Sequence, residues 1–282
     1  MPVKRRPKKM VSVIIPAYKQ EKTILKDLRN IDDALSKIRF DYEIIVVVDG
    51  FSDSTYEKVQ KIGRKNIKVL GYSNHRGRGY ALRYGVARAR GDYIVFLDLG
   101  LKIDPNNISL ILEQTEWYDA DIVVGSKRHP ASKINYPFIR IFYSWGFHIL
   151  VRVLLGLRVK DTQVGLKIFK REVLENVLPR LVIKEYAFDI EVLTVANYLG
   201  YKRIYEAPIK GIWVDSESAG GNGSPSLFTK GIRHTIHETL SVFYRLRILN
   251  YYSDKKKRKW FYDKELDMKV NTGQFSKNIN WK

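Results

Sequence analysis

The 282-residue sequence contains no cysteine, which excludes disulfide bonds and cysteine-ligated metal sites. It also lacks any uncharged apolar run of the roughly 18–20 residues that a membrane-spanning helix needs. The first ten residues are too polar for a secretory signal peptide, so we expect none. Acidic residues are scarce, with 30 Asp and Glu against 50 Lys and Arg, and the formal net charge is +20. This imbalance predicts an anionic partner, namely a membrane, a small substrate or a nucleic acid.

Short β-branched runs alternate with segments of helical periodicity over the first 125 residues. The predicted strands cover residues 11–15, 42–48, 67–70, 93–97 and 121–124. The predicted helices between them cover residues 21–38, 54–62, 79–89 and 108–117. This alternation predicts an α/β fold with a mostly parallel sheet that is flanked by helices. Ligands of such sheets bind beyond the carboxyl ends of the strands.

Three polar motifs follow predicted strands: Pro16-Ala17-Tyr18, Asp49-Gly50 and Asp98-Leu99-Gly100. No G-x-G-x-x-G follows the first strand, which argues against a dinucleotide oxidoreductase. Four segments in this order and spacing resemble the family-2 glycosyltransferases, which have the Rossmann-like GT-A fold. They are residues 11–24, 44–55, 74–85 and 91–105. The second half resembles the dolichyl-phosphate and polyprenyl-phosphate glucosyl- and mannosyltransferases of that family, in residues 125–130, 138–174 and 184–193.

The resemblance implies a set of residues that bind a nucleotide-sugar donor. A carboxylate can accept hydrogen bonds from a nucleoside, a tyrosine ring can pack on a base, and arginine suits phosphate. An alternative interpretation of Asp49 is a turn or helix-cap residue, and residues 74–79 can also be an ordinary glycine-rich loop. The implied donor-binding residues are Pro16, Tyr18, Asp49, Arg76, Arg78, Asp98, Leu99 and Lys102.

One motif departs from the family pattern. The family carries D-x-D, which chelates a divalent metal on the donor diphosphate, whereas this chain has Gly100 at the second position. Asp98 together with donor phosphates can still hold Mg²⁺ or Mn²⁺. A second hypothesis is that Lys102 supplies positive charge in place of some or all of the metal. A third is a weakened or inactive enzyme.

The acceptor side of the site is predicted from the second half of the chain. Lys127 and Arg128 precede an apolar helix and are predicted to bind the acceptor phosphate, although a solvated loop is the alternative. The resemblance places Asp161 and Gln163 in the substrate site, where the alternative is a turn before the next strand. Relatives with hydroxyl acceptors use a carboxylate near Asp189, but a phosphate nucleophile needs positioning more than a strong base. With Asp98, these three residues form the predicted catalytic set.

Two helices are predicted to lie in a membrane surface rather than to span a bilayer. Residues 138–157 form a wide apolar face around a narrow polar stripe: Arg140, Ser144, His148 and Arg152. A buried core helix is the alternative interpretation. Residues 226–249 are the second candidate, and the glycine- and serine-rich residues 215–226 before them are predicted to be a lid over the donor.

The sequence predicts a basic tail (1–9), a GT-A catalytic domain (10–225), C-terminal amphipathic membrane-associated helices (226–265) and a second tail (266–282). The resemblance implies inverting transfer of a hexose from UDP-glucose or GDP-mannose to a polyprenyl or dolichyl phosphate. We expect peripheral attachment to an anionic membrane, on its cytoplasmic face. The alternatives are a glycan or lipid hydroxyl acceptor, and a homologue that binds nucleotide or membrane without turnover. Nucleic acid is not an expected partner, because no nucleic-acid-binding signature accompanies the charge.

Overall fold

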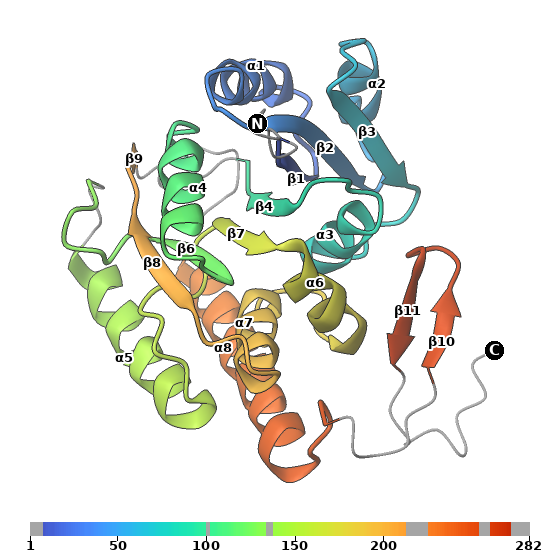
Figure 1. Cartoon of the computed structure of the whole chain (residues 1–282). Coiled ribbons are helices and arrows are strands. Elements are labelled where there is room, and N and C mark those ends of the chain that lie inside the picture. Colours follow the sequence, from blue (N-terminus) through green and yellow to red (C-terminus); the bar gives the residue numbers. More distant parts are fainter. Residues whose placement is uncertain (1–7, 100–101, 134–137, 213–224, 254–259, 272–282) are drawn as a thin grey trace, which may run out of the picture.

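A seven-stranded sheet forms the centre of the molecule (Figure 1). The computed structural model describes residues 8–99, 102–133, 138–212, 225–253 and 260–271. In spatial order the strands are β3 (Ile67–Tyr72), β2 (Asp41–Asp49), β1 (Met10–Ala17), β4 (Tyr93–Leu97), β7 (Leu166–Lys170), β6 (Ile122–Ser126) and β8 (Ile204–Pro208). Every neighbouring pair is parallel except the two that involve β7, which runs antiparallel to β4 and β6. The mostly parallel sheet expected from the sequence is confirmed.

Helices cover both faces of this sheet and create two separate apolar cores. Within β1, Ile14 packs on the side of α3 and α7, while Val13 and Ile15 pack on the side of α1 and α4. Five consecutive β-branched residues, 44–48, are fully buried in β2, as expected for a parallel strand that is covered on both faces. The helices are α1 (Ile24–Leu35), α2 (Thr55–Gln60), α3 (Arg78–Val86), α4 (Asn107–Trp117), α5 (Phe138–Leu155), α6 (Arg171–Val177), α7 (Phe188–Tyr198) and α8 (Pro225–Phe243).

Helix α5 begins and ends close to the predicted bounds, and its described side chains differ from a buried core helix. Val151 and Leu155 are buried, whereas Trp145, Ile149 and Val153 are exposed. The exposed three are spaced by four residues and therefore lie on one face of the helix. Among the described residues, no helix has both the length and the apolar character needed to cross a bilayer. The helix thus packs by one side and presents an apolar stripe on the other.

Helix α8 continues into the π-helical turn η2 (Tyr244–Ile248). Leu240, Tyr244 and Ile248 repeat the spacing of four and are also exposed. The two apolar stripes differ in their surroundings, because α8 and η2 also supply buried polar contacts to α7, described below. Residues 215–224 of the predicted lid, residues 1–7 of the basic tail and the basic run 255–259 lie outside the described residues.

The C-terminal region corrects the predicted boundaries. Instead of helices to residue 265 and a tail after it, strands β10 (Trp260–Asp263) and β11 (Met268–Asn271) form an antiparallel hairpin. Asp263 stabilises its turn by accepting hydrogen bonds from the backbone N–H groups of Glu265 and Leu266. The buried side chains of Leu266 and Val270 join the core beside α3 and α7. Local charge and aromatic content did not reveal this pairing. The remaining elements are β5 (Lys102–Ile103), which pairs with β9 (Gly211–Ile212), and the 3₁₀ turn η1 (Leu178–Arg180).

Candidate active site

Asp98 and Arg78 meet at the carboxyl end of β4. Arg78 is the first residue of α3, and its Nε donates a hydrogen bond of 2.7 Å to Asp98 Oδ1. Its Nη1 donates to Asp189 Oδ2 at 2.9 Å, so one guanidinium bridges two carboxylates from β4 and α7. Burial alone would lower the pKa of Arg78, but the charges of Asp189 and Asp98 raise it above its usual value. Arg78 is therefore a fixed cation within the site.

A second cation, Lys167, approaches the same carboxylates from inside the sheet. Its side chain in β7 is fully buried, and Nζ lies 3.2 Å from Asp189 Oδ1. Nζ also donates to the carbonyl oxygen of Val164. Burial lowers the pKa of Lys167, and the charge of Arg78 lowers it further, against the opposing effect of Asp189. Arg78, Asp98, Lys167 and Asp189 are called the ion cluster below.

Gly165 lets Asp98 occupy its position in the ion cluster. The N–H of Asp98 donates to the carbonyl oxygen of Gly165 at 3.0 Å. A Cβ on Gly165 would stand 2.5 Å from Asp98 Oδ2, much closer than real Cβ atoms approach other atoms. A larger residue at 165 would therefore displace the Asp98 carboxylate.

Asp49 shapes the loop that leads to Arg78. Its buried carboxylate accepts hydrogen bonds from the backbone N–H groups of Arg76 at 2.7 Å and Gly77 at 3.0 Å, and Nδ1 of His75 lies at 2.9 Å. Gly77 has φ +94°, a conformation that favours glycine. The His75 ring packs against Tyr18 with centroids 4.3 Å apart. Asp49 thus holds the loop, whereas Tyr18, which is 41% exposed, is accessible to a ligand.

The structure does not bring every predicted donor residue to the ion cluster. The Arg76 guanidinium points to the C-terminal hairpin, where it pairs with Glu265 at 2.7 Å and donates to the hydroxyl of Tyr80 at 2.8 Å. Leu99 is partly buried against the core on the α1 and α4 side of the sheet. Pro16 lies in β1 opposite Val47. Lys102 begins β5, and its side chain lies outside what the structure describes.

The predicted acceptor residues gather around Asp161, which is 7% exposed. Asp161 Oδ2 accepts from the backbone N–H of Lys127 at 3.0 Å and lies 3.9 Å from Lys127 Nζ. Arg128 Nη1 donates to the carbonyl oxygen of Lys160 at 3.1 Å. Gln163 is exposed, and its amide donates to the carbonyl oxygen of Tyr186 at 3.3 Å. Asp161 therefore ties the loop after β6 to the loop before β7, and these loops carry Lys127 and Gln163.

The first turn of α7, which carries Asp189, is anchored by side chains from α8, η2 and Tyr252. Glu191 Oε2 accepts from the backbone N–H groups of Val182 and Ile183, and its Oε1 accepts from the Tyr252 hydroxyl at 2.5 Å. Arg245 Nη2 lies 3.6 Å from the same oxygen. Burial raises the pKa of Glu191, although the charge of Arg245 and these hydrogen bonds oppose the shift. Glu238 of α8 also accepts from the N–H of Ala187, the N-cap of α7.

Lys167 and the anchoring function of Glu191 were not predicted from the sequence. One signal for Lys167 was present, because a lysine between the apolar residues Leu166 and Ile168 of a strand needs a buried partner. Its partner Asp189 is 22 residues away in sequence, and only the tertiary structure identifies it. Glu191 gave no comparable signal, because an acidic residue in the first turn of a helix is ordinarily exposed.

The residues around Asp98 fit a divalent cation as a single carboxylate ligand. Among the described residues, no group of three or more histidines or carboxylates is close enough to hold a metal ion alone. Mg²⁺ commonly binds one or two carboxylates and completes its octahedron with water and substrate phosphates. The Asp98 side chain is 20% exposed, so a phosphate-bound cation can reach it.

Comparisons with known proteins identify the family. Residues 12–178 match the family model described as glycosyl transferase family 2. A dolichyl-phosphate beta-glucosyltransferase of Dictyostelium discoideum is 35% identical over 204 residues, which cover 67% of this chain and 62% of the relative. The human dolichyl-phosphate beta-glucosyltransferase is 31% identical over 232 residues, covering 76% of this chain and 70% of the relative. The matches cover less than two thirds of the length of the Dictyostelium discoideum and Drosophila melanogaster relatives.

A solved structure agrees with the fold. It is glucosyl-3-phosphoglycerate synthase from Mycobacterium tuberculosis in complex with Mn²⁺, UDP-glucose and phosphoglyceric acid, with a TM-score of 0.64 and 20% sequence identity. The superposition covers 83% of this chain and 80% of that one. The family match covers more than half of the chain and includes the strand ends that carry Asp49 and Asp98. The chain belongs to glycosyl transferase family 2.

Proposed function

We propose that this chain transfers a hexose, with inversion, from a nucleoside diphosphate sugar to the phosphate of a polyprenyl or dolichyl lipid at a membrane surface. The observation that carries the proposal is the ion cluster at the carboxyl edge of the sheet. It combines the fixed Arg78 guanidinium and the buried Lys167 with Asp98, at the place where an α/β sheet binds ligands. The relatives named above as dolichyl-phosphate beta-glucosyltransferases support the same acceptor and favour a glucose donor.

The cluster suits departure of a nucleoside diphosphate. Negative charge grows on the diphosphate as the bond to the anomeric carbon breaks, and preorganised cations stabilise such charge. Arg78 supplies a guanidinium that its two carboxylate partners hold in place. Asp98 would hold Mg²⁺ or Mn²⁺ on the donor, and the cation would supply further positive charge to the diphosphate. The glucosyl-3-phosphoglycerate synthase structure, which holds Mn²⁺ together with UDP-glucose, supports a divalent cation on the donor.

The arrangement of Asp189 favours a phosphate acceptor over a hydroxyl acceptor. One of its oxygens accepts from Arg78 at 2.9 Å, and the other lies 3.2 Å from Lys167. Asp189 is also only 5% exposed, so a substrate hydroxyl reaches its carboxylate only if a neighbouring side chain moves. A phosphate oxygen is already anionic and needs only to be placed in line with the anomeric carbon. Asp189 then acts by fixing Arg78 and Lys167.

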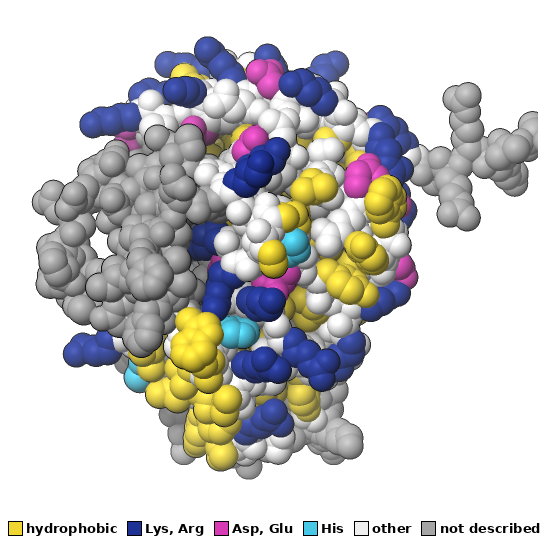
Figure 2. Space-filling model, turned by 90° about the vertical axis from the view of Figure 1, so that its left-hand side faces the viewer, with side chains coloured by type: hydrophobic (Ala, Val, Ile, Leu, Met, Phe, Trp, Pro, Cys, Tyr) yellow, Lys and Arg dark blue, Asp and Glu magenta, His cyan; other side chains and the backbone are white. Residues whose placement is uncertain are grey.

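The acceptor phosphate is assigned to Lys127 and Arg128. Both belong to the loop after β6, and Asp161 holds the Lys127 backbone from the neighbouring loop. Trp145, Ile149 and Val153 form an exposed apolar stripe on α5, which we assign to the lipid tail. Figure 2 shows hydrophobic side chains gathered on this side of the molecule, with Lys and Arg side chains beside them. The net charge of +20 favours an anionic leaflet, so we assign peripheral attachment to the cytoplasmic face.

A product assay tests the proposal. The protein is incubated with a short polyprenyl phosphate and one donor at a time: UDP-glucose, GDP-mannose or UDP-N-acetylglucosamine. Each mixture is run once with Mn²⁺ and once with EDTA. We expect a lipid-phosphate sugar from one donor, of inverted anomeric configuration by NMR, and loss of product in EDTA. Asp98→Asn should abolish turnover, whereas Asp33→Asn, which changes an exposed carboxylate on α1, should not.

The failures of this assay are distinguishable. Parallel incubations replace the polyprenyl phosphate by a polyprenol or a glycan. Product in these, with none from polyprenyl phosphate, would establish a hydroxyl acceptor and refute the assignment of Asp189. Turnover that is unchanged in EDTA would refute the metal at Asp98 and favour the cationic alternative at Lys102. Nucleotide binding with no product from any donor would identify a homologue without turnover.

A further inference from the structure

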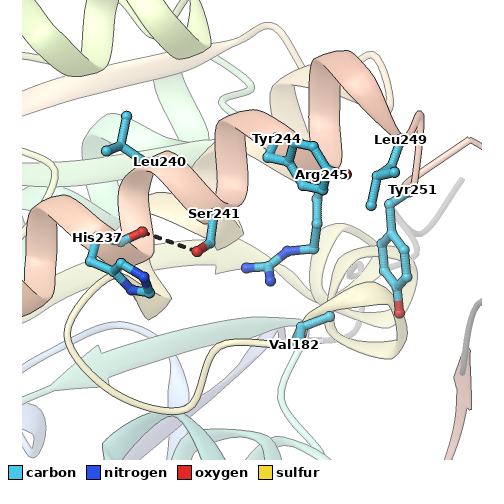
Figure 3. Close-up of a pocket in the computed structure, with 8 residues that line it drawn as sticks. All are labelled: Val182, His237, Leu240, Ser241, Tyr244, Arg245, Leu249 and Tyr251. Carbon is cyan, nitrogen blue, oxygen red and sulfur yellow. Dashed lines mark hydrogen bonds between the residues drawn. The ribbon is translucent and has the colours of Figure 1, made fainter.

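A groove of 470 Å³ lies between the C-terminal part of α8, η2 and Val182, and it shares no residue with the ion cluster (Figure 3). Val182, Tyr244 and Leu249 contribute apolar surface to it. His237, Ser241 and Arg245 contribute polar groups. The groove therefore combines apolar walls with a cation, a combination that fits an amphiphile with an anionic head.

The cation of the groove is held in place by buried partners. Arg245 Nε donates to the Tyr252 hydroxyl at 3.2 Å, and Nη2 lies 3.6 Å from Glu191 Oε1. A guanidinium has five N–H donors, so these two contacts leave donors for a ligand. The Glu191 charge is also shared with Tyr252 and two backbone N–H groups, so Arg245 does not neutralise it alone. A pre-positioned guanidinium loses little entropy when it binds a phosphate.

An apolar stripe runs along the same helix. Leu240, Tyr244 and Ile248 are 46%, 52% and 60% exposed, and Leu240 and Tyr244 also line the groove. Large apolar side chains in a row on a highly cationic protein suit an anionic bilayer, where tails and headgroups are supplied together. An anionic partner protein would match the charge but would not explain why the cation stands within apolar walls.

We propose that the groove binds the phosphate headgroup of one anionic membrane phospholipid, whose acyl chains lie against Leu240, Tyr244 and Ile248. This inference rests on the membrane-surface location in the proposed function, and it adds a lipid site separate from the acceptor site. The bound lipid anchors α8. Glu238 of that helix holds the N-cap of α7, and Arg245 pairs with Glu191, so the anchor is connected to the turn that carries Asp189.

Vesicle binding without any donor or acceptor tests the site. Flotation with phosphatidylcholine vesicles, with and without phosphatidylglycerol, measures the preference for an anionic lipid. Ser241→Phe fills the groove and leaves the Arg245–Glu191 pair intact, and Ser241→Asp instead places a negative charge there. Ser36→Phe adds the same apolar side chain at the exposed C-cap of α1 and is the matched control.

We expect wild type and Ser36→Phe to prefer vesicles that contain phosphatidylglycerol. Both Ser241 variants should bind these vesicles about tenfold more weakly, which is the effect of losing one hydrogen bond to a charged group. Arg247→Gln removes one exposed charge that does not line the groove and should cost about fivefold, the effect of a single basic residue near a membrane. Wild-type affinity in both folded Ser241 variants would overturn the proposal. An equal loss of affinity for vesicles of phosphatidylcholine alone would also overturn it. So would sedimentation that shows a dimer for wild type and a monomer for the Ser241 variants, because the groove would then be a contact between two copies of the chain.

A turnover assay separates this proposal from the proposed function. With short polyprenyl phosphate in detergent, both Ser241 variants should keep wild-type turnover, because no phospholipid is present and the ion cluster is unchanged. If they lose turnover there, the groove belongs to the acceptor site and the inference fails. If wild type shows no transferase activity but still prefers anionic vesicles through the groove, only the proposed function fails.

Discussion

Replacement of Lys167 by methionine tests whether the ion cluster is a coupled unit. Methionine has a similar length but no charge, so the change removes one of the two cations that hold Asp189. At the observed 3.2 Å, with an effective dielectric constant of about 20, the lost attraction is about 5 kcal/mol. Relief of the cost of burying the ammonium offsets part of this. Since breaking a buried pair costs about 3–5 kcal/mol, and Arg78 still holds Asp189, we expect a net loss of about 3 kcal/mol.

Lys170→Met is the matched control. Lys170 lies three residues further along the same strand, and its main partner Asp119, at 2.5 Å, is exposed. Water and salt screen this pair, so its loss should fall within the error of the measurement. Urea denaturation at pH 7 gives the free energy of unfolding of both variants and wild type, and equal slopes with denaturant establish that the two-state comparison holds.

A loss in Lys167→Met no larger than that in Lys170→Met would refute the reasoning. It would mean that Lys167 is neutral in the folded protein or that Arg78 alone satisfies Asp189. Turnover provides the second readout. Because Lys167 fixes Asp189, and Asp189 fixes Arg78, we expect Lys167→Met to lower kcat and Lys170→Met to leave it unchanged. If Lys167→Met is stable and has the wild-type kcat, Lys167 does not contribute to the active site.

Three further predictions follow from single contacts. Gly165→Ala should cost roughly a hundredfold in kcat, because its Cβ displaces the Asp98 carboxylate and a shift of about 1 Å can cost that much. The control is Gly146→Ala, where a Cβ meets nothing within 4 Å, and it should leave kcat unchanged in detergent. An equal kcat in Gly165→Ala and Gly146→Ala would contradict the placement of Asp98. Asp49→Asn should raise the KM for the donor more than it lowers kcat in steady-state assays, because an amide has one acceptor oxygen for the N–H groups of Arg76 and Gly77. Asp41→Asn, at an exposed site, is the control. An unchanged KM in Asp49→Asn would contradict the prediction. Glu191→Gln should flatten the dependence of thermal stability on pH. The pKa of Glu191 is raised in the folded protein, so its contribution to stability is present below the ordinary pKa of 4.5 and is lost as pH rises through the folded pKa. Identical plots of melting temperature against pH for variant and wild type would show that Glu191 does not titrate this way.

The sequence by itself determined the sheet and the edge that carries the site. Runs such as residues 44–48, which are short and β-branched, predict strands buried on both faces, and their alternation with amphipathic segments predicts parallel order. Because parallel strands end at one edge, the positions of Asp49 at the end of β2 and of Asp98 directly after β4 follow from local pattern alone. The same reasoning gave the bounds of α5 closely, since its apolar periodicity is long.

Only the tertiary structure decided which charges meet. Strand β7 enters antiparallel between β4 and β6, and this places Lys167 next to Asp189 of α7. A lysine is stable inside a sheet only where a carboxylate from elsewhere in the chain reaches it, and local periodicity carries no information about that partner. Arg76 and Arg78 lie on either side of Gly77, yet the backbone turn at Gly77 directs one guanidinium to Glu265 and the other to Asp98. That division depends on the C-terminal hairpin, whose docking on α3 is a long-range contact.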